Sequence, residues 1–150
     1  MLYDSCPIVR SWALGVVRHH DNREPLPRVL ALLEDPADGV RCGALQTACR
    51  LAPELKAELG ERMLHDKAPI IVAIACSPLR EAGDPSHVVQ EVLKILLEGR
   101  IVSVRYLLRL VQDLDPASLP QALGLASRAP DPKARAEAEA WSESAEHKQA

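Results

Sequence analysis

Aromatic side chains are almost missing from this chain of 150 residues. Phenylalanine is absent, and tryptophan and tyrosine together make up only 3% of the sequence. The hydrophobic content of 47% is therefore mostly aliphatic, which is enough to build the core of one domain. We expect helices packed through Leu, Val and Ala, because such packing needs few aromatic side chains.

Long apolar runs are also lacking. No stretch approaches the ~18 residues of a membrane helix, so we expect no contact with a membrane. The N-terminus has no basic region followed by an apolar one, and a signal peptide is therefore not predicted. These two absences predict a cytoplasmic protein.

Motifs for catalysis or metal binding are missing as well. The cysteines (Cys6, Cys42, Cys49 and Cys76) have no CxxC spacing, and the histidines show neither HxxxH nor HxH. No GxSxG and no phosphate-binding glycine loop is present. We therefore expect no metal, no cofactor and no enzymatic activity. Cys42, Cys49 and Cys76 are expected to act as small buried hydrophobes in a reducing compartment.

A strong excess of one charge is lacking too. The net charge is −3, which argues against a general affinity for nucleic acid.

What the sequence does contain is a recurring pattern, clearest in the stretch 35–51. Apolar residues recur there at three- and four-residue spacing, as on one face of a helix. Copies follow at intervals of 30 to 33 positions. The paired residues that mark them are Val9-Arg10, Val40-Arg41, Ile71-Val72, Val104-Arg105 and Ala134-Arg135. A fixed period in this range is typical of a solenoid.

Second apolar runs lie between the copies, so each unit is predicted to be a helical hairpin. The expected first helices are 24–34, 54–65, 85–98 and 118–127, and the expected second helices are 3–20, 35–51, 68–82, 100–114 and 133–141. Pro78 is expected to kink or end its helix. We expect one domain over 1–141, followed by a polar tail at 142–150 that frays.

Several residues predict where the helices begin. Asp-Pro pairs at 35–36, 84–85, 115–116 and 131–132 each combine a cap with a first-turn proline. Ser118 and Gln121 have the spacing of a capping box. The helix at 3–20 has no preceding first helix, so the chain is expected to begin on a half-unit or to come from a longer array. Apolar surface is then expected on Val9, Ala13 and Val17.

The pattern resembles HEAT repeats of the short kind found in bacterial HEAT-like proteins and phycobilin lyase subunits. In that family an acid in the turn precedes an arginine in the second helix by six residues. Asp4 with Arg10 and Asp35 with Arg41 keep this spacing, and the resemblance extends from about 3 to 141. It implies an all-α, right-handed α-solenoid of about four to five HEAT-like hairpins.

The resemblance also implies that the second helices line a concave groove. Their charges are mainly positive, so we expect a basic groove. The candidate partner-binding residues are Trp12, Arg18, Arg50, Arg80 and Arg109. The alternative for these arginines is a solvated surface that complements the helix C-termini, and for Trp12 a place in the core. Arg10 and Arg41 are expected to bond turn carboxylates and carbonyls within the array.

From this pattern we predict a non-catalytic interaction module that binds a protein or an acidic peptide in its groove. The alternative is an enzyme or enzyme subunit of HEAT-like type, either a lyase-type chaperone subunit or a relative of the DNA base-excision enzymes. A third possibility is a truncated piece of a larger scaffold.

Overall fold

The computed structural model describes residues 1–20, 22–99 and 104–149, with side chains up to Ser144. Within these ranges the chain forms nine α-helices and no strand, as predicted for an all-α protein. The helices are α1 (Pro7–His19), α2 (Leu26–Ala31), α3 (Asp38–Leu51), α4 (Lys56–Met63), α5 (Pro69–Ala82), α6 (Pro85–Leu97), α7 (Val104–Leu114), α8 (Leu119–Ala126) and α9 (Pro132–Gln149).

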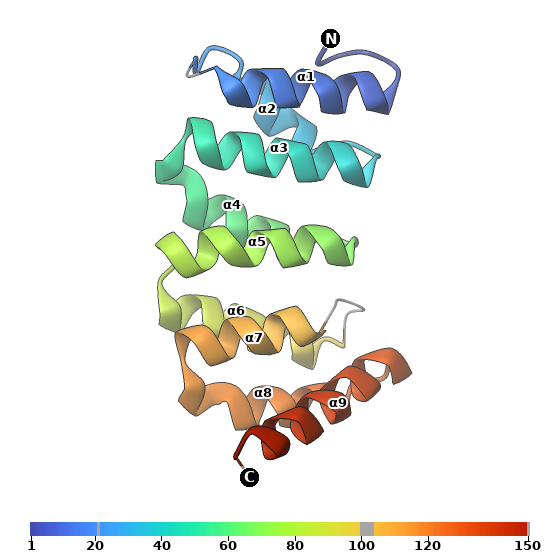
Figure 1. Cartoon of the computed structure of the whole chain (residues 1–150), viewed down its shortest axis with the longest axis vertical. Helices are drawn as coiled ribbons and strands as arrows, with labels where there is room; N and C mark the ends of the chain where they lie inside the picture. The colour runs from blue at the N-terminus through green and yellow to red at the C-terminus, as the bar shows by residue number, and fades with distance from the viewer. Residues whose placement is uncertain (21, 100–103, 150) are drawn as a thin grey trace.

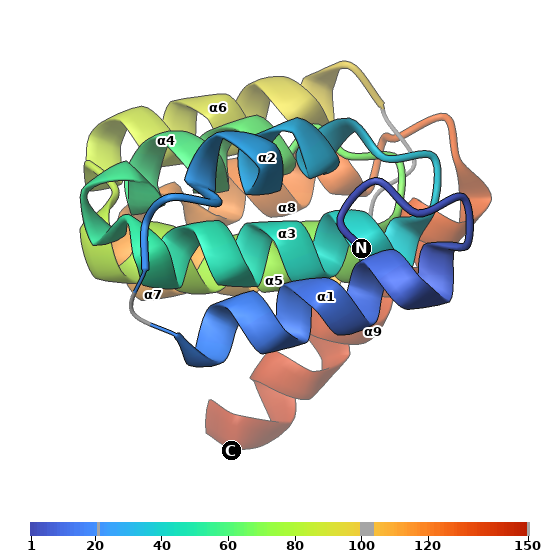
Figure 2. The ribbon, with the colours of Figure 1, turned by 90° about the horizontal axis from the view of Figure 1, so that it is seen from above.

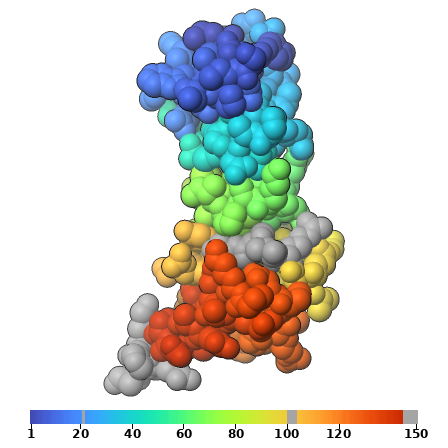
Figure 3. Space-filling model, turned by 90° about the vertical axis from the view of Figure 1, so that its right-hand side faces the viewer, coloured from blue at the N-terminus to red at the C-terminus, as the bar shows by residue number. Residues whose placement is uncertain are grey.

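The helices form two layers. Helices α1, α3, α5 and α7 lie side by side in one layer, and α2, α4, α6 and α8 form the other (Figures 1 and 2). Most contacts join helices that are close in chain order, such as α1 with α3 and α4 with α5. The chain therefore advances steadily along the long axis, from the N-terminus at one end to α9 at the other (Figure 3). Helix α9 crosses this end obliquely (Figure 1).

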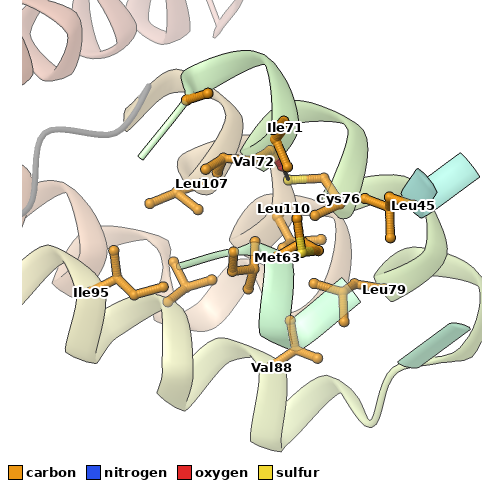
Figure 4. Close-up of a cluster of buried hydrophobic side chains, with 14 of the residues drawn as sticks. Leu45, Met63, Ile71, Val72, Cys76, Leu79, Val88, Ile95, Leu107 and Leu110 are labelled. Atoms are coloured by element: carbon orange, nitrogen blue, oxygen red, sulfur yellow. Dashed lines mark hydrogen bonds between the residues drawn. The ribbon is translucent and has the colours of Figure 1, made fainter. Parts of the chain in front are cut away.

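The core between the layers is aliphatic. Leu45, Ile71, Leu79 and Leu107 are at most 1% exposed and come from α3, α5 and α7. Figure 4 shows several of these side chains converging with residues of α4 and α6. Trp141 of α9 packs against the same cluster. Burial of this apolar surface is the main force that holds the layers together.

Asp84 and Asp131 directly precede α6 and α9, as predicted for Asp-Pro pairs, whereas Asp35 lies three residues before α3 and Asp115 caps a 3₁₀ turn ahead of α8. The carboxylates of Asp35, Asp84, Asp115 and Asp131 each accept a hydrogen bond from a backbone N–H two or three residues later. The prediction of a capping box at Ser118 is wrong, because the Ser118 side chain accepts no capping hydrogen bond. Its hydroxyl instead donates to the Asp115 carboxylate at 2.6 Å, because that aspartate already organises the turn.

Helix α5 ends at Ala82 as predicted, and Pro78 lies inside it without ending it. The predicted end at 141 is wrong for α9, which continues as helix to Gln149. The predicted start of the helix at 100 falls on 100–103, which lie outside the described residues, and α7 is described from Val104.

Arg10 and Arg41 are buried, and each joins two segments that are far apart in the chain. The Nε of Arg10 donates to Asp35, 25 residues later, at 2.7 Å. The Nε of Arg41 donates to Asp66, again 25 residues later and at 2.7 Å. The predicted internal role of both arginines is thus confirmed, and each carboxylate partner lies in the turn that precedes the next helix of the same layer.

The same arginines also fix their own turns. Arg10 donates through Nη1 to the carbonyls five and six residues earlier, at 3.0 and 2.6 Å. Arg41 does so at 3.3 and 2.8 Å, and Arg135 in α9 at 2.9 and 2.7 Å. The arginine therefore bonds the backbone carbonyl of the residue six positions earlier, and not the acidic side chain at that position. Arg135 keeps this bond although Ala129 stands where the other two units have an aspartate.

Apolar surface on α1 is not where the sequence placed it. Ala13 is only 5% exposed, and Val9 and Val17 are half-buried. These residues face the rest of the molecule, and the exposed side chains are Ile8, Trp12 and Val16. None of the helices in the described ranges combines the length and hydropathy needed to cross a membrane.

Candidate partner-binding face

A hollow of about 700 Å³ lies between the C-terminal halves of α3 and α5. Its apolar floor includes Leu45, Ile74 and Pro78. Its polar wall comes from the ends of α1 and α3, the start of α4 and the end of α5, and consists of Arg18, Gln46, Arg50, Lys56, Ser77 and Glu81. An apolar floor with a few polar groups around it is the usual form of a binding site.

Positive charge dominates this hollow. Arg18, Arg50 and Lys56 are its three cationic side chains, and Glu81 is its one acidic side chain. Lys56 Nζ pairs with Glu81 Oε2 at 2.6 Å, which raises the pKa of Lys56 and lowers that of Glu81. Arg18 donates to the neutral Gln46 amide at 2.5 Å, so this bond leaves its charge uncompensated.

A thiol also lines the hollow but is poorly suited to chemistry. Burial is the largest influence on Cys49 and raises its pKa, while Lys56 acts weakly in the opposite direction. A thiol with a raised pKa carries little thiolate at neutral pH and is a poor nucleophile. The Cys49 thiol is therefore not activated for nucleophilic attack.

Arg80 and Arg109 meet at a different place, around Asp113 of α7. Arg80 Nε lies 2.6 Å from Asp113 Oδ2, and Arg109 Nε lies 3.6 Å from Oδ1. Asp113 therefore interrupts the positive charge that was predicted to run along this layer. Arg109 also lines a second hollow of about 450 Å³ between α7 and α9, together with Arg105 and Trp141.

Trp12 is not brought together with the arginines. It is 73% exposed and lines a third hollow with Ser11, Gly15, Val16 and His19 of α1 alone. Its alternative place in the core is also wrong.

The predicted residues thus fall into three groups: Arg18 with Arg50, Arg80 with Arg109, and Trp12 apart. Sequence reasoning missed Gln46, Lys56 and Glu81. Lys56 lies on α4, which was predicted as a first helix, and only the second helices were expected to line the groove. One signal was available, because Lys56 and Glu81 are 25 residues apart, the same separation as Arg10 and Asp35.

Comparison of the chain with family models, with curated proteins and with solved structures finds no match. Among the described residues, no three histidine, cysteine or acidic side chains are grouped so that they could hold a metal ion.

Proposed function

We propose that this chain is a non-catalytic binding module, and that it holds an acidic, partly apolar segment of a protein in the hollow between α3 and α5. The observation that carries the proposal is the surplus of cations around an apolar floor in that hollow. Carboxylates on the partner would meet Arg18 and Arg50, and an apolar side chain would cover Ile74. Such charge complementarity favours fast and selective association.

The architecture we propose is a right-handed α-solenoid of HEAT-like repeats. Support comes from Arg10, Arg41 and Arg135, which make the same backbone contacts at widely spaced points of the chain. The two layers of helices in chain order also fit this arrangement. In a HEAT-like solenoid the layer that contains α3 and α5 would be the concave side, which is where such modules hold their partners.

Binding is favoured over catalysis by the state of the groups in the hollow. Lys56 is engaged by Glu81, and the pKa of Cys49 is raised, so neither is activated as a nucleophile. A catalytic site normally contains a titratable group whose pKa is matched to its task.

The proposal can be tested with an array of short synthetic peptides that vary in acidic and leucine content. We expect the wild-type chain to bind acidic peptides with an apolar residue, and the Arg18→Glu, Arg50→Glu variant to lose that binding. Arg128→Glu, Lys133→Glu changes two exposed charges outside the three hollows and serves as the control for net charge. Equal binding by the wild type and the double variant would overturn the proposal.

Duplex DNA provides a separate comparison. A nucleic-acid function would give retention at low salt that falls steeply as salt increases, because bound counterions are released. We expect no such retention. Binding of DNA that Arg18→Glu, Arg50→Glu abolishes would replace the proposed protein partner by a phosphate backbone.

A further inference from the structure

Helix α1 carries an exposed apolar stripe that the proposed function does not use. Ile8, Trp12 and Val16 are 67%, 73% and 56% exposed and follow one another at intervals of four residues. This spacing places them on one face of the helix. The stripe lies at the N-terminal end of the stack, where α1 is the outermost helix of its layer (Figures 1 and 3).

The corresponding face of α3 shows what kind of surface this is. Gly43 and Thr47 lie 31 residues after Trp12 and Val16. A Cβ on Gly43 would lie 3.3 Å from Leu14 Cδ1, and Thr47 Oγ1 donates to the Leu14 carbonyl at 3.3 Å. On α3, therefore, this face is covered by a neighbouring helix that lies alongside it. The stripe on α1 is the corresponding face, and its side chains remain exposed.

Beside the stripe is a recess that belongs to the same helix. It has a volume of about 450 Å³ and is lined by Ser11, Trp12, Gly15, Val16 and His19. No atom lies within 4 Å of the place where a Cβ on Gly15 would be. The indole of Trp12 thus projects next to an open notch above Gly15.

A protruding side chain and a notch on the same helix can fit together across a two-fold axis, because each copy then places its protruding side chain in the notch of the other. We propose that two copies of this chain associate through α1, antiparallel, with the Trp12 indole of each seated above Gly15 of the other. Tryptophan suits this role, since a buried indole contributes large apolar area and is frequent at the centres of interfaces.

Charge favours the antiparallel direction. Arg18 and His19 lie in the last turn of α1, with His20 beyond it, and Asp4 precedes the first turn. In an antiparallel pair the basic end of one α1 faces the acidic end of the other, and the two helix dipoles oppose each other. A parallel pair would place like charges together at both ends.

The interface would consist of little more than one helix from each copy, which is small for a stable complex. We therefore expect a dimer that dissociates at about micromolar concentration. This inference does not depend on the proposed function, because Ile8, Trp12 and Val16 do not line the hollow between α3 and α5. Arg18 lines that hollow and contributes to the dimer only its charge near the end of α1.

Sedimentation velocity over a concentration series tests the proposal with the whole chain. We expect the mass to rise from one chain to two and to stop there. Trp12→Glu is expected to weaken dimerisation by at least about thirtyfold. Gly15→Leu fills the notch while leaving Trp12 in place, and should weaken it to a similar degree. Ile70→Glu changes another side chain that is 56% exposed, on α5, and should dimerise as the wild type does.

Gly15→Leu is the decisive variant because its folding can be checked independently. The Cβ site is open and leucine favours helix more than glycine does, so its thermal midpoint should not fall. A wild-type chain that stays monomeric throughout the series would overturn the proposal. So would a folded Gly15→Leu variant that dimerises normally, or growth beyond two copies, which would indicate head-to-tail contacts instead.

Discussion

The guanidinium of Arg10 and the carboxylate of Asp35 form two parallel hydrogen bonds, Nε to Oδ2 at 2.7 Å and Nη2 to Oδ1 at 2.8 Å. The same carboxylate accepts a bond from the Ala37 amide at 2.9 Å. Arg10 meanwhile donates to the carbonyls of Asp4 and Ser5. One side chain of α1 therefore fixes both its own turn and the turn that begins α3.

The equivalent pair between Arg41 and Asp66 should contribute measurably to stability. Asp66→Asn keeps an acceptor for the Ala68 amide but removes the charge that faces Arg41. We expect the free energy of unfolding to fall by about 2 kcal/mol, because a buried charged donor loses its charged acceptor. Denaturant titration followed by circular dichroism measures this change.

Asp38→Asn is the matched control, because Asp38 also pairs with Arg41 at 2.7 Å but its side chain is 57% exposed. Exposed pairs contribute about 0.2–1 kcal/mol, so this variant should lose much less than Asp66→Asn. Equal losses would show that burial does not set the strength of the pair.

Acid should remove the contribution of the buried pairs. The Arg10 hydrogen bond is the main cause that lowers the pKa of Asp35 below its ordinary value of 3.8. Burial acts to raise the pKa of Asp66, but the bonds from Arg41 and from the Ala68 amide outweigh it and lower the value. Both carboxylates therefore bind protons less readily in the folded chain than in the unfolded one.

The sign follows from proton linkage. The stabilisation is fully present above the unfolded-state pKa and disappears as pH falls through the lower folded-state pKa. We expect the difference in unfolding free energy between wild type and Asp35→Asn, Asp66→Asn to be constant from neutral pH to about pH 5 and to shrink below that. A difference that stays the same in acid would contradict this account.

Gly60 should be needed for the packing of α4 on α5. A Cβ there would lie 2.7 Å from Leu79 Cγ and 3.3 Å from the Ala75 carbonyl. Although alanine favours helix by about 1 kcal/mol, we expect Gly60→Ala to lower the free energy of unfolding by about 1–3 kcal/mol through overpacking.

Gly124→Ala in α8 provides the comparison, since the nearest atom to its added Cβ is the end of Arg128 at 3.7 Å. This substitution should be neutral or stabilising by about 0.5–1 kcal/mol. If Gly60→Ala were as stable as Gly124→Ala, the close contact between α4 and α5 would not matter.

The thiols should differ in reactivity according to their burial. Cys6 is exposed, Cys42 and Cys49 are half-buried with a raised pKa, and Cys76 is buried with its pKa raised to about 11 by loss of hydration. We expect a thiol reagent at neutral pH to modify Cys6 first and Cys76 only after unfolding. Mass spectrometry of peptides at successive times measures the order, and early modification of Cys76 would contradict the packing of α5.

The sequence predicted the helices and the internal arginines well, because these depend on local signals. Asp84 with Pro85 marks a helix start wherever the helix packs, and Arg10 carries a spacing that recurs at Arg41. The direction of a side chain around its helix was harder to predict. Trp12 was assigned to the groove, but it is 73% exposed on α1, and Gly43, 31 residues later, lies against Leu14 of the neighbouring helix in the same layer.

The hollow was partly missed for a related reason. Lys56 was assigned to the opposite layer, yet it lies at the very start of α4, where the chain has only just left α3. Its long side chain therefore reaches Glu81 of α5. Pro78 does not end α5, which packs against α3, α4 and α7 and continues to Ala82.

The short sequence separation of the contacts has a consequence for how such a chain can change over time. Each helix contacts partners that lie close to it in chain order, and the buried arginine pairs span only 25 residues. A hairpin could therefore be gained or lost by duplication or deletion without rearrangement of the others. In the repeat architecture proposed above, the length of the molecule can change while these local contacts stay the same.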